Sequence, residues 1–266
     1  MGKQLSVLDF TGMKGSDRKI SMVTCYDFWS AQVLNDTDVD CLLVGDSLAM
    51  VMHGFDSTVY ADVELMALHT RAVRRGAPNK FIVADMPFLS MRKGLEPAMD
   101  AVQALMQSGA NAVKIEGEAG QLEIISHIVE SGVPVMGHLG LTPQSVHGFG
   151  GHKVQGRGEE ASRALTESAR RLAQVGCFAL VLECVPTKLA HCISTTIPVP
   201  TIGIGAGART DGQVLVLQDM LGTNPGFKPR FLRHYADSYD AIRAAVNRYH
   251  DDVQSGAFPS REESYG

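Results

Sequence analysis

Residues 42–47, Leu-Leu-Val-Gly-Asp-Ser, join a short apolar run directly to an acidic side chain. The same arrangement recurs where Phe81–Ala84 is followed by Asp85 and where Ala179–Leu182 is followed by Glu183. Runs this rich in Val, Ile and Leu are typical of parallel strands that are buried on both faces. The polar residue after each run therefore marks the carboxyl end of a predicted strand.

Such runs alternate with amphipathic stretches along most of the chain. The predicted strands are Ile20–Tyr26, Asp40–Asp46, Lys80–Asp85, Ala112–Glu116, Val133–His138, Phe178–Glu183, Pro200–Ile204 and Gln213–Leu217. The predicted helices include Val63–Arg75, Glu96–Ser108, Gln121–Ser131 and Glu159–Val175, each followed by or ending next to a glycine that can cap it. This alternation in 266 residues predicts a (β/α)₈ barrel. A doubly wound open sheet stays the alternative, because alternation alone does not reveal whether a sheet closes.

Neither a linker nor a shift in composition divides the chain, so we predict one barrel domain over residues 1–266. A short segment of about residues 1–18 is predicted to cover the amino-terminal mouth of the barrel. Near the other end, Tyr239–Val253 fits a helix that closes the ring of helices around the strands.

Charge and cysteine content restrict the partners and the compartment. The net charge is -5 and the basic residues are scattered, which argues against a nucleic-acid partner. Apolar runs are too short to span a membrane. The five cysteines form no C-x-x-C pair, which indicates reduced thiols and a cytoplasmic protein. We expect small molecules and further copies of the chain as partners.

Ionisable or polar side chains stand at the carboxyl ends of five predicted strands. They are Asp46, Asp85, Lys114 with Glu116, His138 and Glu183. In a parallel barrel these ends share one mouth, where the active sites of such enzymes lie. Each residue alone could be a helix cap or half of a buried ion pair. Together they predict a site, because a barrel of apolar strands has no structural need for so many charges at one end.

Several carboxylates with one histidine and no cysteine pair favour Mg²⁺, which prefers oxygen ligands. Zinc fits less well, since the histidines do not cluster near the acids. Two glycine-rich segments are weaker signals. Gly203–Gly207 lacks the complete dinucleotide or phosphate-loop pattern and predicts a tight turn beside a crowded site. The long connection Leu139–Gly158 predicts a lid, a binding loop or an assembly loop.

Five motifs make the chain resemble the ketopantoate hydroxymethyltransferase family. They are Leu43–Ser47, Val113–Gly117, Gly137–Ser145, Leu182–Pro186 and Gly203–Gly207, in order along a match from about Ile20 to Pro259. The stretch Gly137–Ser145 is the most specific of them. One departure is His152, where such enzymes often carry an aromatic residue, and it affects only the glycine-rich loop.

The resemblance implies a (β/α)₈ barrel that is assembled as a homodecamer. It implies transfer of a hydroxymethyl group from 5,10-methylenetetrahydrofolate, a folate co-substrate, to the 2-oxo acid 3-methyl-2-oxobutanoate. The product is 2-dehydropantoate (ketopantoate), a precursor of pantothenate and coenzyme A, and the reaction passes through a Mg²⁺-stabilised enolate.

The resemblance also implies roles for individual residues. Asp46, Asp85 and Glu116 are similar to residues at the Mg²⁺ site. Asp46, Ser47, Asp85 and Lys114 resemble residues that contact the substrate, and Glu183 resembles the catalytic base. We add His138 as a residue that could hydrogen-bond the substrate or a group of the folate.

Two other interpretations stay open at this point. One is another Mg²⁺ barrel that acts on 2-oxo acids, similar to isocitrate lyase or phosphoenolpyruvate mutase. The lyases of that kind are expected to carry an acid–base cysteine, and Cys184, the only candidate at the rim, should point away from the face of Glu183. The other is a non-catalytic barrel that binds a small acid or serves in assembly.

Overall fold

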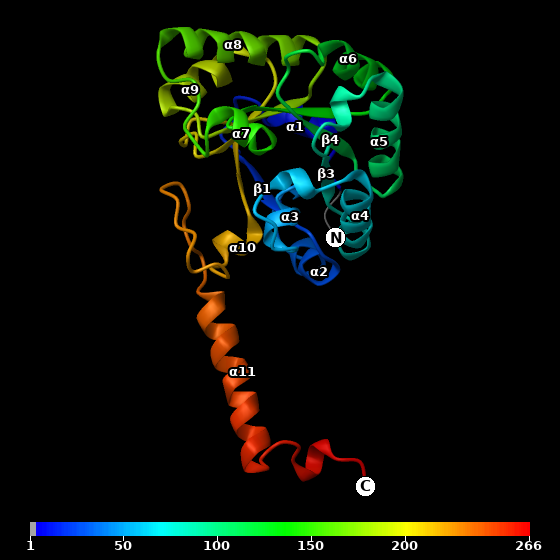
Figure 1. The fold of residues 1–266 in the computed structure, drawn as a ribbon, viewed down its shortest axis with the longest axis vertical. Coiled ribbons are helices and arrows are strands. Elements are labelled where there is room, and N and C mark those ends of the chain that lie inside the picture. Colours follow the sequence, from blue (N-terminus) through cyan, green and yellow to red (C-terminus); the bar gives the residue numbers. More distant parts are fainter. Residues whose placement is uncertain (1–3) are drawn as a thin grey trace. The chain divides into compact units, whose positions relative to one another are not determined.

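Eight parallel strands close into a barrel in the computed structural model, which describes residues 4–266 (Figure 1). The strands are β1 (Ile20–Thr24), β2 (Cys41–Val44), β3 (Phe81–Asp85), β4 (Ala112–Glu116), β5 (Val135–Gly140), β6 (Ala179–Glu183), β7 (Thr201–Ile204) and β8 (Gly212–Leu215). Each strand pairs with the next along the chain, and β1 pairs with β8. The predicted (β/α)₈ barrel is confirmed, and the open-sheet alternative is wrong.

Helices connect the strands, and α4, α5 and α6 pack against the outside of the barrel wall (Figure 1). The α-helices are α1 (Val7–Met13), α2 (Phe28–Asn35), α3 (Leu48–Val51), α4 (Val63–Gly76), α5 (Leu95–Gln107), α6 (Leu122–Glu130), α7 (Val146–Phe149), α8 (Glu159–Gln174), α9 (Thr187–Thr196), α10 (Leu217–Met220) and α11 (Ser238–Ser255). Short 3₁₀ helices are η1 (Thr58–Tyr60), η2 (Ser90–Arg92), η3 (Pro143–Ser145) and η4 (Arg261–Glu263). Within residues 4–266, none of these helices has the length and apolar character that crossing a membrane requires.

The chain forms two compact units, Met1–Leu215 and Val216–Gly266. The first contains all eight strands and α1 to α9. The second contains α10, α11 and η4, and the helix predicted at Tyr239–Val253 is present as α11. None of residues 238–255 is buried. Closure of the ring of helices by α11 stays a prediction.

Helix α1 packs into the amino-terminal mouth of the barrel. A cap formed by the whole segment of about residues 1–18 stays a prediction, and residues 1–3 lie outside the described part. Phe10 of α1 is fully buried within the cluster of side chains that fills the barrel interior. Its ring centroid lies 5.0 Å from that of Phe81 and 5.7 Å from that of Phe178. Because these two residues stand at the amino ends of β3 and β6, α1 seals that end and leaves the carboxyl-terminal mouth for the site.

Asp211, which precedes β8, fastens α1 to the barrel. Its carboxylate accepts hydrogen bonds from Lys14 Nζ (2.8 Å), Gly15 N (3.1 Å), Thr201 N (2.8 Å) and Thr201 Oγ1 (3.0 Å). Burial alone would raise the pKa of Asp211, but Lys14 and the two backbone N–H groups outweigh it and hold this pKa below its usual value. The ionised form is therefore part of the folded state.

Replacing Asp211 by asparagine should lower the free energy of unfolding at pH 7 by about 2–3 kcal/mol, because the charge-assisted bonds are lost. A depressed folded-state pKa contributes stability above the unfolded-state pKa, and that contribution disappears as the pH falls through the folded-state value. The difference between wild type and variant should therefore shrink below about pH 4. Urea unfolding at several pH values measures it, with the exposed Asp17→Asn as a control. Equal stability of wild type and Asp211→Asn at pH 7 would contradict this account.

Candidate active site

The register of the strands brings the predicted site residues to one mouth of the barrel. Asp85 lies opposite Lys114, Glu116 lies opposite His138, and Glu183 lies opposite Gly140. Each of these pairs is at or next to the carboxyl end of its strands. The pattern of polar strand ends in the sequence thus corresponds to one location in space.

A chain of contacts joins these residues. The backbone N–H of Asp46 donates to Asp85 Oδ2 at 3.1 Å, and Asp85 Oδ1 lies 2.9 Å from Lys114 Nζ. Lys114 Nζ is 3.1 Å from His138 Nδ1, and His138 Nε2 is 3.3 Å from a Glu183 oxygen. The side chains of Asp85, Lys114 and His138 are 3–4% exposed, whereas that of Glu183 is 18% exposed. Of these contacting residues, Glu183 is the one that a ligand in the mouth of the barrel can reach most easily.

The buried acids repel one another and depend on one lysine. Burial, together with Glu116 and Asp85, raises the pKa of Asp46 well above its usual value. Burial also raises the pKa of Asp85, although Lys114 opposes it. Burial alone would lower the pKa of Lys114, but the surrounding carboxylates outweigh it and raise this pKa. Lys114 is therefore a fixed positive charge, and the two aspartates favour a further cation beside them.

His138 lies between Lys114 and the two glutamates, Glu116 and Glu183, and contacts all three. Burial and the charge of Lys114 lower the pKa of His138, but Glu116 and Glu183 outweigh them and raise it to about 8. Its Nδ1 lies 3.1 Å from Lys114 Nζ and 3.4 Å from Glu116 Oε1. A protonated Nδ1 donates to Glu116, and an unprotonated one accepts from Lys114. Burial raises the pKa of Glu116, but His138, Lys114 and the Gln144 N–H outweigh it and hold it below its usual value.

Two residues that the sequence did not single out complete the cluster. Gln144 donates from Nε2 to Asp46 Oδ2 at 2.8 Å, and its backbone N–H donates to Glu116 Oε2 at 3.0 Å. The Tyr26 hydroxyl lies 2.8 Å from Ser47 Oγ and so connects the predicted substrate residue Ser47 to the buried interior. The sequence contained a hint of each residue. Gln144 lies within the motif Gly137–Ser145, and Tyr26 is the last residue of the first predicted strand.

The donor set fits a magnesium ion held by two carboxylates. Within the described residues no three His, Cys, Asp or Glu side chains converge in a geometry that could hold a metal. Mg²⁺ commonly uses only one or two carboxylates and takes its other ligands from water and substrate. Asp46 and Asp85 can supply that pair. Both Glu116 oxygens already face protein partners, so a direct bond from Glu116 to a metal stays a prediction.

The backbone is strained on both sides of the cluster. Among residues 4–266, the non-glycine residues with positive φ are Leu89 (59°) and Cys184 (48°). Cys184 directly follows Glu183, and Leu89 lies in the β3–α5 connection. Such strain is frequent at functional sites. Burial and Glu183 raise the pKa of the Cys184 thiol to about 11, so this thiol is protonated at neutral pH and is a poor acid–base catalyst.

The glycine-rich segments have mainly packing roles near the mouth. A Cβ on Gly207, at φ 82°, would lie 2.4 Å from the Thr187 side chain, and one on Gly140, at φ 95°, would lie 2.2 Å from the Glu183 carbonyl oxygen. The turn predicted at Gly203–Gly207 therefore lies against α9. The connection after β5 contains η3 and α7 and provides Gln144.

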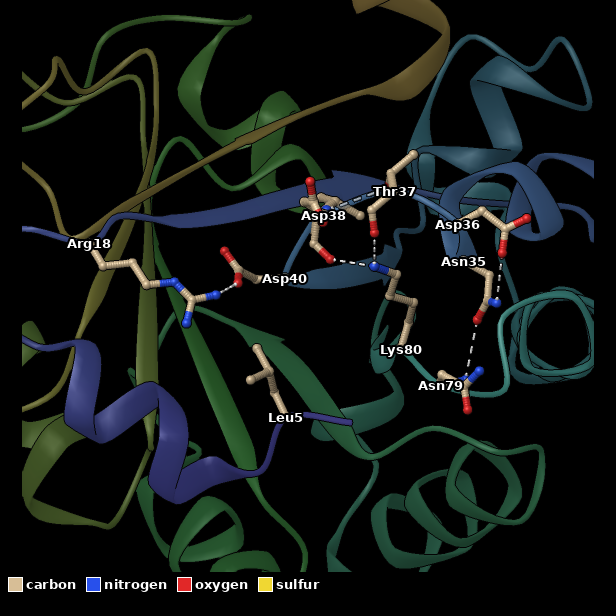
Figure 2. A pocket seen from close by; sticks show the side chains of 10 residues that line it. Leu5, Arg18, Asn35, Asp36, Thr37, Asp38, Asp40, Asn79 and Lys80 are labelled. Carbon is tan, nitrogen blue, oxygen red and sulfur yellow. Dashed lines mark hydrogen bonds and ion pairs between the residues drawn. The ribbon is translucent and has the colours of Figure 1, made fainter. Parts of the chain in front are cut away.

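A cavity without any of the predicted site residues lies at the opposite end of the barrel. About 450 Å³ in volume, it is lined by residues that precede β2 and β3 (Figure 2). There Arg18 pairs with Asp40, and Lys80 donates to the carbonyl groups of Thr37 and Val39. None of the predicted site residues lines this cavity. The site is therefore defined by the charged cluster rather than by cavity size.

Solved structures with the same fold come from enzymes of different chemistry. A 2,3-dimethylmalate lyase of the PEP mutase/isocitrate lyase superfamily matches with a TM-score of 0.62 and 15% identity, over 99% of this chain and 89% of that one. A phosphonopyruvate hydrolase matches with a TM-score of 0.59 and 11% identity, over 97% and 92% of the two chains. At these identities the likeness shows the barrel fold alone.

Sequence comparisons assign the family. The model of the ketopantoate hydroxymethyltransferase family matches residues 4–261. A relative from Bdellovibrio bacteriovorus, named 3-methyl-2-oxobutanoate hydroxymethyltransferase, is 56% identical over 260 residues, which cover 98% of this chain and 99% of the relative. A relative of the same name from Coxiella burnetii is 54% identical and covers 96% of each chain. These matches exclude the lyase and non-catalytic interpretations. The chain belongs to the ketopantoate hydroxymethyltransferase family and is a hydroxymethyltransferase.

Proposed function

We propose that this chain transfers a hydroxymethyl group from 5,10-methylenetetrahydrofolate to 3-methyl-2-oxobutanoate and so makes ketopantoate for pantothenate synthesis in the cytoplasm. One observation supports it most: a fixed cation, a pair of buried aspartates and the most accessible carboxylate, Glu183, share one mouth of the barrel. Breaking a C–H bond next to a ketone requires this combination, since a base must take the proton and positive charge must stabilise the resulting enolate.

Each residue has a part in this reaction. Glu183 takes the C3 proton of the oxo acid, and the electrons of that bond pass to the keto oxygen. Lys114, Ser47 and the aspartate pair bind and orient the oxo acid, and His138 Nε2 lies 3.3 Å from the Glu183 carboxylate, where a protonated ring stabilises its charge. Mg²⁺ bound by Asp46 and Asp85 would act as a Lewis acid toward the keto oxygen. The enolate carbon then bonds to the methylene carbon of the donor, water supplies the hydroxyl group, and tetrahydrofolate leaves.

Mass spectrometry of the reaction products tests this function. The purified chain is incubated with Mg²⁺, 3-methyl-2-oxobutanoate and 5,10-methylenetetrahydrofolate. Ketopantoate should form only when all three are present. Formation of another product, or of none, would contradict the proposal.

Loss of one aspartate should weaken the response to magnesium. Replacing Asp46 by asparagine should raise the Mg²⁺ concentration for half-maximal activity by at least about ten-fold. Even the mutation of a residue that only hydrogen-bonds to a metal ligand typically lowers metal affinity by about 10–100-fold. Activity is titrated against Mg²⁺, and the exposed Asp56→Asn serves as the control. An unchanged Mg²⁺ requirement in Asp46→Asn would contradict the assignment of this ligand.

We also propose self-association, as a homodecamer. Helix α11 supports it, because five large apolar residues on it recur at alternating spacings of three and four and are 42–59% exposed. They are Tyr239, Ile242, Val246, Tyr249 and Val253. A stripe with this repeat is typical of a helix that packs against another element. Sedimentation equilibrium gives the number of subunits, and a monomer at working concentration would contradict the proposal.

A further inference from the structure

A second cavity adjoins the charged cluster on the side of β3 and β4. It has a volume of about 110 Å³ and is lined by the end of β4, by the connections that follow β3 and β4, and by η3. They are Met86, Pro87, Phe88, Leu89, Met91, Arg92, Ile115, Glu116, Gln121, Gln144 and Ser145. Two of them, Glu116 and Gln144, also belong to the cluster, since Gln144 contacts both Asp46 and Glu116. A ligand in this cavity is thus separated from the aspartate pair by one side chain.

The two walls of the cavity differ in chemistry. One wall is apolar, with Met86, Met91 and Ile115 each at most 5% exposed. The other wall offers hydrogen-bond acceptors. Gln144 uses both hydrogens of its amide nitrogen, one toward Asp46 Oδ2 and one toward the Met86 carbonyl at 2.9 Å. Its Oε1 is consequently left as an acceptor, and the Gln144 backbone N–H holds Glu116 Oε2 at 3.0 Å.

The volume and the walls suit one flat ring system with N–H donors along one edge. The cavity is below the roughly 300 Å³ at which pockets for whole drug-sized ligands begin. Thioether and aliphatic groups pack well against the faces of such rings. The 2-amino-4-oxopyrimidine half of a pterin is flat and presents its amino group and a ring N–H on one edge, which complement Glu116 and Gln144.

The rim of the cavity suits the rest of a folate. Phe88 and Leu89 are 39% and 45% exposed, and they provide an apolar surface for an aminobenzoyl ring. Exposed Arg92 lies next to them and can pair with a carboxylate. Leu89 has a left-handed backbone conformation, which glycine would adopt without strain. A leucine is present there despite that strain, which is frequent at functional sites.

We propose that this cavity binds the pterin ring of the one-carbon donor, with the aminobenzoyl group over Phe88 and Leu89. The inference rests on the proposed function, because it concerns the second substrate of the same reaction. It places the methylene carbon on the Glu116–Gln144 side of the cluster, while Glu183 takes the proton from the side of β6.

Tetrahydrofolate binding, measured by isothermal titration calorimetry on the full chain, tests the site. Ser145 lines the cavity and is exposed, so the larger side chain of Ser145→Trp should fill part of the cavity and weaken binding by at least about ten-fold. Leu89→Gly should weaken it by about three- to ten-fold through lost apolar contact, while it relieves backbone strain. His147→Trp, an exposed neighbour outside the cavity, is the matched control and should bind as the wild type does.

The outcomes separate this inference from the function on which it rests. If both cavity variants bind tetrahydrofolate as the wild type does, or if they raise only the KM for the oxo acid, the pterin site is wrong although the wild type still makes ketopantoate. If the wild type neither binds tetrahydrofolate nor makes ketopantoate, the proposed function itself fails. Leu89→Gly keeps the test informative if Ser145→Trp does not fold, because a merely structural role of Leu89 predicts higher stability with unchanged affinity.

Discussion

Replacing Glu183 by glutamine should slow the exchange of the C3 proton of 3-methyl-2-oxobutanoate by about 10²–10⁴-fold, the usual contribution of a positioned general base. Glutamine keeps the shape of the side chain and can still bond to His138 Nε2, which lies 3.3 Å from the carboxylate. It cannot accept the proton. The affinity for the oxo acid should therefore stay close to that of the wild type while the exchange rate falls.

Proton NMR in D₂O measures the exchange, and calorimetry measures the binding of the oxo acid. Glu167→Gln is the matched control, because Glu167 is 48% exposed on α8 and pairs with Arg170 and Arg171 of the same helix. Its exchange rate should equal that of the wild type. If Glu183→Gln exchanged at the wild-type rate, another group would be the base.

Replacing Lys114 by methionine should have the second largest effect, on stability as well as on activity. Removing one partner of a buried ion pair costs about 3–5 kcal/mol, because the remaining charge is left uncompensated. Here Asp46, Asp85 and Glu116 all lose the positive charge of Lys114, which lowers the pKa of each carboxyl group and so favours its ionised form. The variant should therefore unfold at lower urea concentrations, and Mg²⁺ should restore part of the loss, since it replaces the missing positive charge.

Urea unfolding of Lys114→Met with and without Mg²⁺ measures this effect, and the exposed Lys93→Met is the control. The control should lose little stability in either buffer. If Lys114→Met were as stable as the wild type without Mg²⁺, the aspartates would not be charged in the folded state. The electrostatic description of the cluster would then be wrong.

Much of the barrel could be predicted because buried parallel strands carry a local signal. β4 occurs at the predicted residues, Ala112–Glu116, since Lys114 and Glu116 alternate there with apolar neighbours. β5 was predicted at Val133–His138 but runs from Val135 to Gly140. Its last residues are strand because Leu139 and Gly140 pair with Leu182 and Glu183 of β6. Such pairing between distant segments is not visible in a local pattern.

The same distinction holds for the site. Polar residues at strand ends could be found from the sequence, and the register brings them to one mouth. The role of Gln144 could not be found, because it depends on the fold of η3, which places the amide against Asp46. The cavity beside Gln144 is likewise formed by three connections that are far apart in the sequence. Tyr26 could have been included, since it ends its predicted strand as Asp46 and Asp85 do.

The most direct test of the central claim, that this barrel mouth removes the C3 proton, uses the wild-type chain in D₂O with Mg²⁺ and 3-methyl-2-oxobutanoate, with and without 5,10-methylenetetrahydrofolate. We predict that the C3 proton signal disappears in the presence of the enzyme and Mg²⁺, and that chelation of Mg²⁺ slows its loss. Retention of the signal at the uncatalysed rate under both conditions would contradict the account.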